Sequence, residues 1–215
     1  RLWFWRGAFH WWRSGGYREL PDAEVRARII QQLNRSYCRL SSGVVNNVID
    51  QLRAQAILAF DIDPPAWLDE HPDGWEPREV MSTRSGLVHL PSLVGGGEYL
   101  IPPTPKFFTP IALNYAFDAE APRPSAWLEF LDQLWGDDTE SIDTLQEWFG
   151  LCLVADTSYQ KILLIAGPKR SGKGTIARVQ RQLVGPGNVA GPTLSGLATH
   201  FGLWPLIGKT LAVIS

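Results

Sequence analysis

The sequence feature that most constrains this chain is the glycine-rich stretch Gly167–Thr175, which reads GPKRSGKGT. An apolar run, Ile162–Ala166, precedes it, and a segment with helical character, Ile176–Leu183, follows it. Strand, glycine-rich turn, lysine and helix in this order are typical of a phosphate-binding loop. The glycines let backbone N–H groups point at phosphate oxygens, and the helix N-terminus adds partial positive charge. The stretch therefore predicts a nucleotide site at a strand-to-helix turn.

The usual pattern of such a loop is G-x-x-x-x-G-K-[ST], and this chain departs from it at one position. Gly167, Gly172 and Lys173 match the pattern, whereas Gly174 stands where Ser or Thr is expected and Thr175 comes one residue later. Lys173 is predicted to reach the outer phosphates. The alternative is a glycine-rich turn that binds nothing, and the flanking strand and helix favour the phosphate loop over it.

The overall composition limits the number of domains and the classes of function that the chain can have. A chain of 215 residues holds one large or two small domains, and 45% hydrophobic with 20% charged residues is typical of a globular protein. The net charge is −2, so no global basic field indicates nucleic acid, and any DNA contact must be local. No apolar run approaches membrane-spanning length, and no signal peptide is evident.

The cysteines and histidines do not indicate a metal site. Cys38 and Cys152 have neither a second cysteine nor a histidine at metal-ligand spacing, and the four histidines are scattered. This usage fits a reducing, cytoplasmic setting. The chain begins at Arg1 and ends within an apolar run, residues 210–214, that is typical of a buried strand. We therefore expect a fragment of a longer protein.

The N-terminal half predicts a small hairpin and two helices. A β-hairpin is expected over residues 2–12, where four tryptophans stack on bases or form an aromatic core. Few basic residues are interleaved, which favours the core; the tryptophans are Trp3, Trp5, Trp11 and Trp12. Helices are expected from Pro21–Asp22 onward, with Asp22 as N-cap, and over residues 44–58. Loops follow over 61–80 and 91–110, with a strand between them over 85–90.

The C-terminal part predicts two helices rich in aromatic residues and then alternating strands and helices. The helices start near Ser125 and Thr139, and their aromatic stripes are typical of core. After residue 160 we expect strands over 162–166, 188–190 and 210–214, and a short helix over 197–201 capped by Thr193 or Ser195. The predicted fold class is α/β: a mainly helical N-terminal region with a small β-hairpin, then the start of a P-loop parallel sheet with flanking helices. The predicted division is 1–124 and 125–215.

Several short motifs, in order, carry a family resemblance. They are Phe117–Ala121, Trp127–Leu131, Leu145–Gly150, Asp156–Lys161, the glycine-rich loop and Leu206–Lys209. Together they resemble the phage- and plasmid-type primase–helicases, which are similar to the poxvirus primase–helicase and have a superfamily 3 helicase motor of AAA+ type. Ser85–Leu90 and Pro103–Phe108 match the helical region before that motor. The departures are Ser171 where the family often has Asn, Gly174 where it often has Ser, and Leu151 where Tyr is common.

The resemblance implies an activity and assigns roles to residues. It makes Gly167–Thr175 the Walker A loop, with Lys173 neutralising the β- and γ-phosphates of ATP and Thr175 supplying a hydroxyl to Mg²⁺. The implied ATP-binding residues are Gly167, Pro168, Lys169, Arg170, Ser171, Gly172, Lys173, Gly174 and Thr175. Strand 211–214 would correspond to the strand that leads to the Walker B acid. Walker B, sensor, arginine finger and pore loops would follow Ser215, and a primase domain would precede residue 1.

The resemblance also implies partners. They are single-stranded or forked DNA, further copies of the chain in a hexameric ring, and other replication proteins, in the cytoplasm of a bacterial host. ATP hydrolysis would then drive DNA unwinding, and residues 1–110 would form an assembly or collar element.

Two alternatives remain open. A nucleotide kinase of adenylate-kinase type also carries G-K-G-T, although its loop usually lies close to the N-terminus and an arginine-rich lid follows. A degenerate ATPase fold that only assembles with partners would explain the substituted loop.

Overall fold

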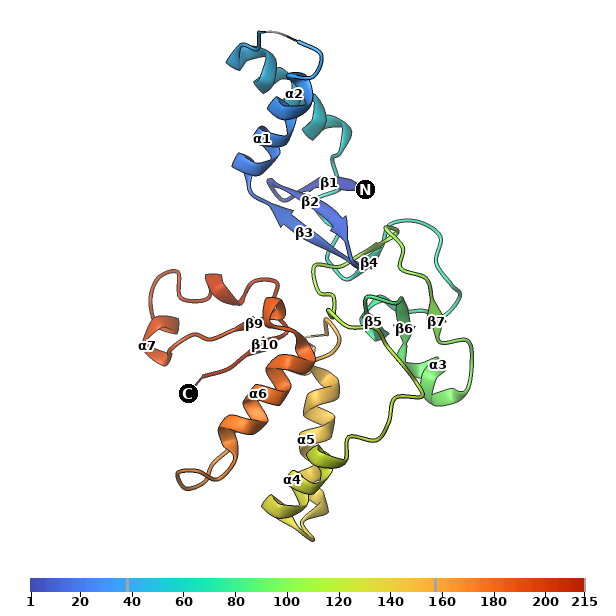
Figure 1. Cartoon of the computed structure of the whole chain (residues 1–215), viewed down its shortest axis with the longest axis vertical. Coiled ribbons are helices and arrows are strands. Elements are labelled where there is room, and N and C mark those ends of the chain that lie inside the picture. Colours follow the sequence, from blue (N-terminus) through green and yellow to red (C-terminus); the bar gives the residue numbers. More distant parts are fainter. Residues whose placement is uncertain (38, 157, 215) are drawn as a thin grey trace.

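The computed structural model describes residues 1–37, 39–156 and 158–214, so that Cys38, Thr157 of the quoted motif and Ser215 lie outside the described residues. The chain is mixed α/β, with helices and small sheets. Along its longest axis a helical hairpin on a three-stranded sheet occupies one end, short strands occupy the middle, and α4, α5 and α6 occupy the other end (Figure 1). None of the helices among the described residues combines the length and apolar character that crossing a membrane requires.

The N-terminal sheet consists of three antiparallel strands, β1 (Leu2–Trp5), β2 (Ala8–Arg13) and β3 (Gly16–Leu20). Two-residue turns join them, and Arg6–Gly7 and Ser14–Gly15 all have positive φ. Such turns match the twist of antiparallel strands. The predicted hairpin is confirmed, and β3 extends it.

The two faces of this sheet bury different parts of the chain. On one face Phe9 packs against Val25 and Ala56, next to α1 (Asp22–Leu33) and α2 (Ser42–Gln55). Both helices are confirmed. The predicted cap is wrong, because Pro21 occupies the N-cap position and Asp22 lies within the first turn of α1. The N-cap of α2 is Ser41, whose Oγ accepts from Val44 N at 3.3 Å.

The other face of the sheet packs on the middle of the chain. Tyr17, Leu58 and Phe108 are buried there, with Trp3, Trp5 and Trp12 half-buried around them. The Tyr17 hydroxyl donates to Pro105 O at 2.6 Å and accepts from Trp3 Nε1 at 3.1 Å. Burial raises the pKa of Tyr17 to about 12. These tryptophans therefore serve an aromatic core, as their sequence context favoured.

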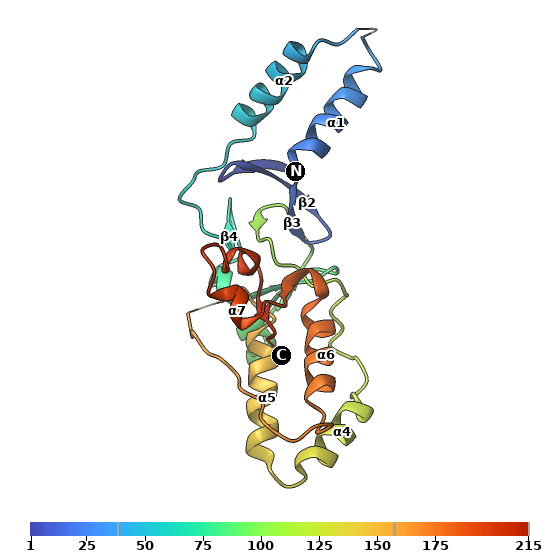
Figure 2. The ribbon, with the colours of Figure 1, turned by 90° about the vertical axis from the view of Figure 1, so that its left-hand side faces the viewer.

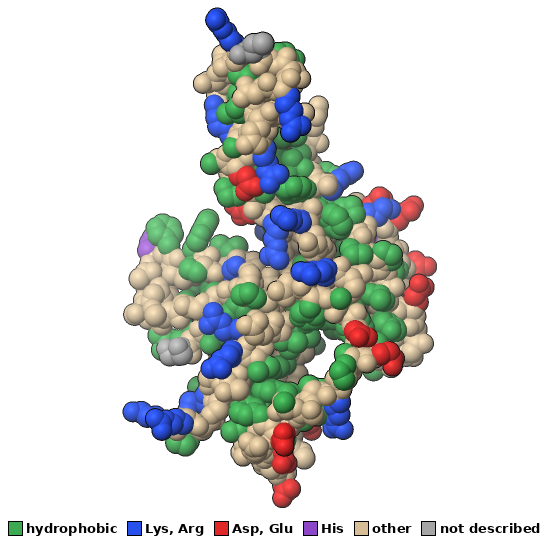
Figure 3. All heavy atoms as spheres, in the orientation of Figure 1, with side chains coloured by type: hydrophobic (Ala, Val, Ile, Leu, Met, Phe, Trp, Pro, Cys, Tyr) green, Lys and Arg blue, Asp and Glu red, His purple; other side chains and the backbone are tan. Residues whose placement is uncertain are grey.

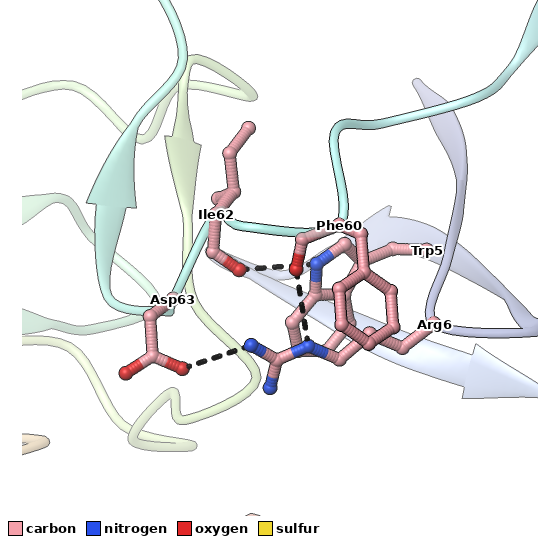
Figure 4. A network of polar contacts seen from close by, with 5 residues as sticks. All are labelled: Trp5, Arg6, Phe60, Ile62 and Asp63. Carbon is pink, nitrogen blue, oxygen red and sulfur yellow. Dashed lines mark hydrogen bonds and ion pairs between the residues drawn. The ribbon is translucent and has the colours of Figure 1, made fainter.

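A polar network joins the first turn of the sheet to residues 60–63, in the loop that follows α2 (Figure 4). Trp5 Nε1 donates to Ile62 O at 3.1 Å, and the Arg6 guanidinium lies 3.4 Å from Asp63 Oδ1. The same guanidinium lies over the Trp5 ring, 4.3 Å from its centroid, and Arg6 Nε donates to Phe60 O at 3.4 Å. The positive charge of Arg6 thus interacts with Asp63 and with the Trp5 ring.

The middle of the chain forms two small antiparallel sheets. β4 (Ala66–Trp67) pairs with β8 (Phe107–Phe108), and β6 (Leu87–His89) lies between β5 (Val80–Ser82) and β7 (Leu100–Ile101). The strand predicted over 85–90 is β6. The segments predicted as loops contain the strands β4, β7 and β8, because pairing partners far apart in sequence decide such short strands. They also contain the short helices η1 (Pro77–Glu79) and α3 (Leu90–Gly95).

Three helices form the C-terminal end, and α5 and α6 lie side by side above α4 (Figure 2). They are α4 (Ser125–Trp135), α5 (Thr139–Leu151) and α6 (Lys173–Val184). Their shared core contains Leu131, Leu145, Phe149 and Ile176. Both predicted aromatic helices are confirmed. The N-cap of α5 is Asp138 rather than Thr139.

Beyond α6 the chain is built from short elements: η2 (Pro186–Asn188), β9 (Val189–Ala190), α7 (Leu194–Leu197), η3 (Trp204–Leu206) and β10 (Leu211–Ala212). β9 and β10 pair in parallel, and Thr193 caps α7, which begins before the predicted residue 197. The division at 124/125 stays a prediction; Asn188 Nδ2 donates across it to Ala112 O at 3.1 Å.

The strand predicted over Ile162–Ala166 is not formed. Leu163 and Ile165 are half-buried against the helical core, whereas Ile162 and Leu164 are 93% and 86% exposed. This alternation is typical of a strand with one buried face. No backbone hydrogen bond joins residues 162–166 to another described residue, and a strand requires such a partner. The parallel sheet among the described residues is therefore limited to β9 and β10.

Candidate functional site

The glycine-rich loop connects the extended apolar segment to α6, as its sequence predicts. Gly172 is the N-cap of α6, with φ 79° and ψ −8°, and Arg170 also has a positive φ, 66°. Gly185, with φ 86°, follows the last residue of α6 as its C-cap. The loop therefore curls into the N-terminus of a twelve-residue helix, whose free N–H groups and dipole favour an anion.

Gly172 is required by its surroundings as well as by its φ. A Cβ built on Gly172 would lie 3.0 Å from Leu134 Cδ2 and 3.0 Å from Phe130 Cζ. The loop thus rests directly on α4. Phe130 and Leu134 belong to the stripe that helical spacing predicts for the core, and this spacing carries no signal that they support the loop.

Lys173 closes the loop upon itself. Its Nζ donates to Gly167 O and Pro168 O, both at 2.7 Å, and to Ser171 Oγ at 3.2 Å. A Cβ on Gly167 would lie 2.8 Å from Ser171 Oγ, so the first glycine of the motif leaves room for this arrangement. The ammonium group therefore lies within the curl of the loop, where a phosphate group would meet it.

The nine predicted residues form one continuous unit, but not all of them converge. Lys169 and Arg170 are exposed at the loop tip, and the contacts that the structure gives join Lys173 to Gly167, Pro168 and Ser171. The sequence from residue 157 to residue 215 contains no Asp or Glu. A ligand of negative charge therefore meets no opposing carboxylate from this segment.

The hydroxyl position of the motif differs from the usual one. Lys173, Gly174 and Thr175 are the first three residues of α6, so the hydroxyl of Thr175 lies one residue, or about 100° of helix rotation, beyond the usual position. A Cβ on Gly174 would meet nothing within 4 Å. The fold leaves space for a hydroxyl side chain at 174 that the sequence does not supply. The hydroxyl of Thr175 remains the one on α6 that lies nearest to the loop.

A pocket of about 320 Å³ lies beside the start of α6. Leu163–Ile165 form one wall and Leu211–Ile214 another, and Lys173 and Gly174 contribute to the same pocket. Both extended segments thus line one pocket, and no backbone hydrogen bond between described residues joins them. Val213 and Ile214, which follow β10, therefore line the same pocket as the first residues of α6.

Buried groups near the pocket do not add nucleophilic chemistry. Gln180 Nε2 donates to Cys152 Sγ at 3.3 Å, and burial raises the pKa of Cys152 to about 11, so its thiol is neutral at physiological pH. No cluster of three or more His, Cys, Asp or Glu side chains able to hold a metal ion occurs in residues 1–37, 39–156 and 158–214.

No model of a known protein family matches this chain, and no curated protein matches it. The resemblance to primase–helicases therefore stays a prediction from the sequence.

Proposed function

We propose that this chain is the ATP-binding part of a replicative DNA helicase or primase–helicase of superfamily 3, AAA+ type. The observation that carries the proposal is the position of Lys173, whose Nζ lies within the curl of Gly167–Ser171 at the N-terminus of α6. A lysine there neutralises charge on the outer phosphates of ATP. The helix N-terminus and the absence of carboxylates in residues 157–215 support the same ligand.

The geometry of the C-terminal strand supports the motor assignment. In the proposed motor, β10 corresponds to the strand that leads to the Walker B acid. Ile214 lines the same pocket as Lys173 and Gly174. A carboxylate that follows this strand would therefore lie near the loop, where Mg²⁺ would neutralise phosphate charge when bound. The described residues that would serve this ion are Thr175 and, by its position alone, the backbone around Gly174.

Under this proposal the chain binds single-stranded or forked DNA as a homo-oligomeric, hexameric ring, with other replication proteins, and ATP hydrolysis drives DNA unwinding. The fold would be the start of a P-loop parallel sheet, with Leu163–Ile165 and β10 as two of its strands. The half-buried side chains of Leu163 and Ile165, and the pocket that both segments line, support this arrangement. Residues 1–124 would form the collar before the motor.

Titration calorimetry with ATP, ADP and AMP tests the proposal. We expect ATP and ADP to bind, because the loop recognises outer phosphates, and AMP to bind much more weakly. Lys173→Ala should weaken ATP binding roughly 10- to 150-fold, while circular dichroism stays unchanged. Unaltered ATP affinity in that variant would overturn the proposal.

A second candidate is a degenerate ATPase fold that assembles without hydrolysis, and Gly174 favours it, since the usual hydroxyl is missing. Absence of any heat with ATP would support this candidate. Transfer of phosphate from ATP to AMP, without dependence on DNA, would instead support the kinase alternative.

A further inference from the structure

Charge is distributed very unevenly along this chain although its net value is only −2. Residues 1–58 carry nine Arg, no Lys and four acidic residues, and residues 157–215 carry seven basic residues and no acidic one. The intervening residues 59–156 carry four basic and eighteen acidic residues. The three segments therefore have net charges of +5, −14 and +7 in the order N-terminal, middle and C-terminal.

The fold brings the two basic segments into contact. Lys209 Nζ donates to Gly187 O at 2.6 Å, and a Cβ built on Gly187 would lie 3.6 Å from Arg18 Nη1. A basic side chain of β3 and one that precedes β10 thus converge on η2, which directly follows α6. Arg18 and Lys209, which are 191 residues apart in sequence (209 − 18), thus share one surface there.

Basic side chains of this surface are exposed and unpaired. Arg13 and Arg18 on the sheet, and Arg178 and Arg181 on α6, are all exposed, and among the described residues no carboxylate forms an ion pair with any of them. The arginines on α6 lie on the side away from its buried residues, which are Ile176, Gln180 and Val184. No acidic residue occurs within α6.

Other arginines of the N-terminal segment are already engaged. Arg28 lies 2.6 Å from Glu24 Oε1, and Arg53 lies near both Asp22 and Asp50. Together with Arg6, these residues hold the sheet and its helices. The unpaired arginines are thus distinct from those with a structural role.

The space-filling view shows the extent of this surface (Figure 3). Lys and Arg side chains occur from the tip of the α1–α2 hairpin, past the sheet, to α6, whereas most of the Asp and Glu side chains in view lie at the right and lower edges. The basic side chains follow the longest axis of the molecule. An elongated distribution of this kind suits a charged polymer better than a small ligand.

We propose that this basic surface, defined by Arg13, Arg18, Arg178, Arg181 and Lys209, binds the phosphodiester backbone of DNA. The planar guanidinium group presents paired N–H donors that match phosphate oxygens, and contacts with phosphates need no base sequence. The choice of DNA as the polymer rests on the proposed function, but the surface does not include the nucleotide loop. Trp3, Trp5 and Trp12 of the sheet pack in its core, and the Arg28 guanidinium lies over the Trp11 ring, 4.5 Å from its centroid, so binding is through the DNA backbone rather than by base stacking.

Fluorescence anisotropy with the full 215-residue chain, without nucleotide, tests the surface. The probes are a labelled single-stranded oligonucleotide of mixed sequence and its duplex, at about 50 to 200 mM salt. We expect Arg178→Gln with Arg181→Gln to weaken binding about tenfold, since two exposed charge pairs are lost. The slope of log affinity against log salt should fall by about 1.4 for the single strand, the value for two phosphate contacts. Arg13→Gln with Arg18→Gln should act in the same direction.

The matched control is Arg84→Gln with Arg123→Gln, which removes two exposed arginines from the acidic middle segment and changes net charge equally. This pair should bind DNA within twofold of the unaltered chain. The proposal is overturned if the control weakens binding as much as the α6 pair, if the α6 pair has no effect, or if the unaltered chain binds no DNA. Binding to phosphatidylserine vesicles but not to DNA would also overturn it.

Calorimetry with ATP on the same variants separates this inference from the proposed function. The α6 pair should keep the ATP affinity of the unaltered chain. DNA binding that is lost in the α6 pair, in a chain that never binds ATP, would support the surface and contradict the nucleotide site. ATP binding without DNA binding would overturn the surface alone.

Discussion

Lys173 Nζ lies 2.7 Å from the carbonyl oxygen of Gly167, so the first residue of α6 holds the first residue of the loop that precedes it. The contact makes the loop a closed unit before any ligand is bound. A phosphate group that enters the loop would exchange these carbonyl contacts for stronger ones, because its oxygens carry charge. The lysine therefore links loop geometry to ligand affinity.

Removal of this ammonium group should lower ATP affinity sharply. Lys173→Ala is expected to cost about 1.5 to 3 kcal/mol of binding, roughly 10- to 150-fold, the value of a hydrogen bond to a charged group. Titration calorimetry with ATP measures the change. Lys169→Ala is the matched control, because it removes an exposed charge from the same loop, and its effect should be several-fold smaller. Equal losses in the two variants would show that net charge alone decides affinity.

The open space at Gly174 allows the usual hydroxyl to be restored. Gly174→Ser should fit without a clash and should stabilise α6 by a few tenths of a kcal/mol, since Ser has a higher helix propensity than Gly. If Mg²⁺ contributes to ATP binding, this variant should show a larger gain in ATP affinity on addition of Mg²⁺ than the unaltered chain. Calorimetry with and without Mg²⁺ measures the gain.

The Thr175→Ala variant tests whether the hydroxyl of Thr175 already contributes to the binding of Mg²⁺. A loss of the Mg²⁺-dependent gain in Thr175→Ala, with Thr175→Ser unchanged, would assign the role to this hydroxyl. The same gain in both variants would contradict that role.

Gly172 should resist substitution for two separate reasons. Gly172→Ala places a Cβ at a φ of 79° and 3.0 Å from side chains of α4, so the free energy of unfolding should fall by about 1 to 3 kcal/mol. Urea denaturation measures this. Gly150→Ala in α5 is the control, because a Cβ there meets nothing and no positive φ is present; it should stabilise the chain by up to about 1 kcal/mol. In a Leu134→Ala background the cost of Gly172→Ala should be smaller, since one of the two contacts is gone.

The N-cap of α5 should make stability depend on pH. Asp138 accepts from the Ser141 hydroxyl at 2.7 Å and from Ser141 N at 3.1 Å, and these bonds lower the pKa of Asp138 below its ordinary value of 3.8. Because the pKa is lower in the folded state, the stabilisation is complete above pH 3.8 and is lost as the pH falls through the folded-state value. Asp138→Ala should therefore be less stable than the unaltered chain at pH 7.

The difference in stability between Asp138→Ala and the unaltered chain should disappear in strong acid. Urea denaturation of both proteins at several pH values between 7 and 2 measures this difference as a shift of the unfolding midpoint. Asp137→Ala, one residue earlier and outside the cap, should show no such convergence. A deficit of Asp138→Ala that stays constant over this range would contradict a cap made by the charged carboxylate.

Local sequence patterns predicted the elements whose contacts lie close in sequence. The helical recurrence of aromatic residues after Ser125 and Thr139 predicted α4 and α5, and the Arg6–Gly7 turn predicted the first hairpin. Long-range pairing decided the rest. β4 depends on β8, about 40 residues away, and the segment Ile162–Ala166 has a strand-like pattern but no hydrogen-bonded neighbour. A pattern of period two predicts which side is buried, but it does not supply a partner.

The sequence alone determined the chemistry of the loop and the start of its helix, because glycine, lysine and hydroxyl spacing are local properties. Only the tertiary structure decided that Gly172 rests against α4 and that Lys173 folds back onto Gly167. It also decided where the charge lies. Arg18 and Lys209 are far apart in sequence and meet at Gly187, because strand pairing and helix packing, rather than chain order, set which charges share a surface.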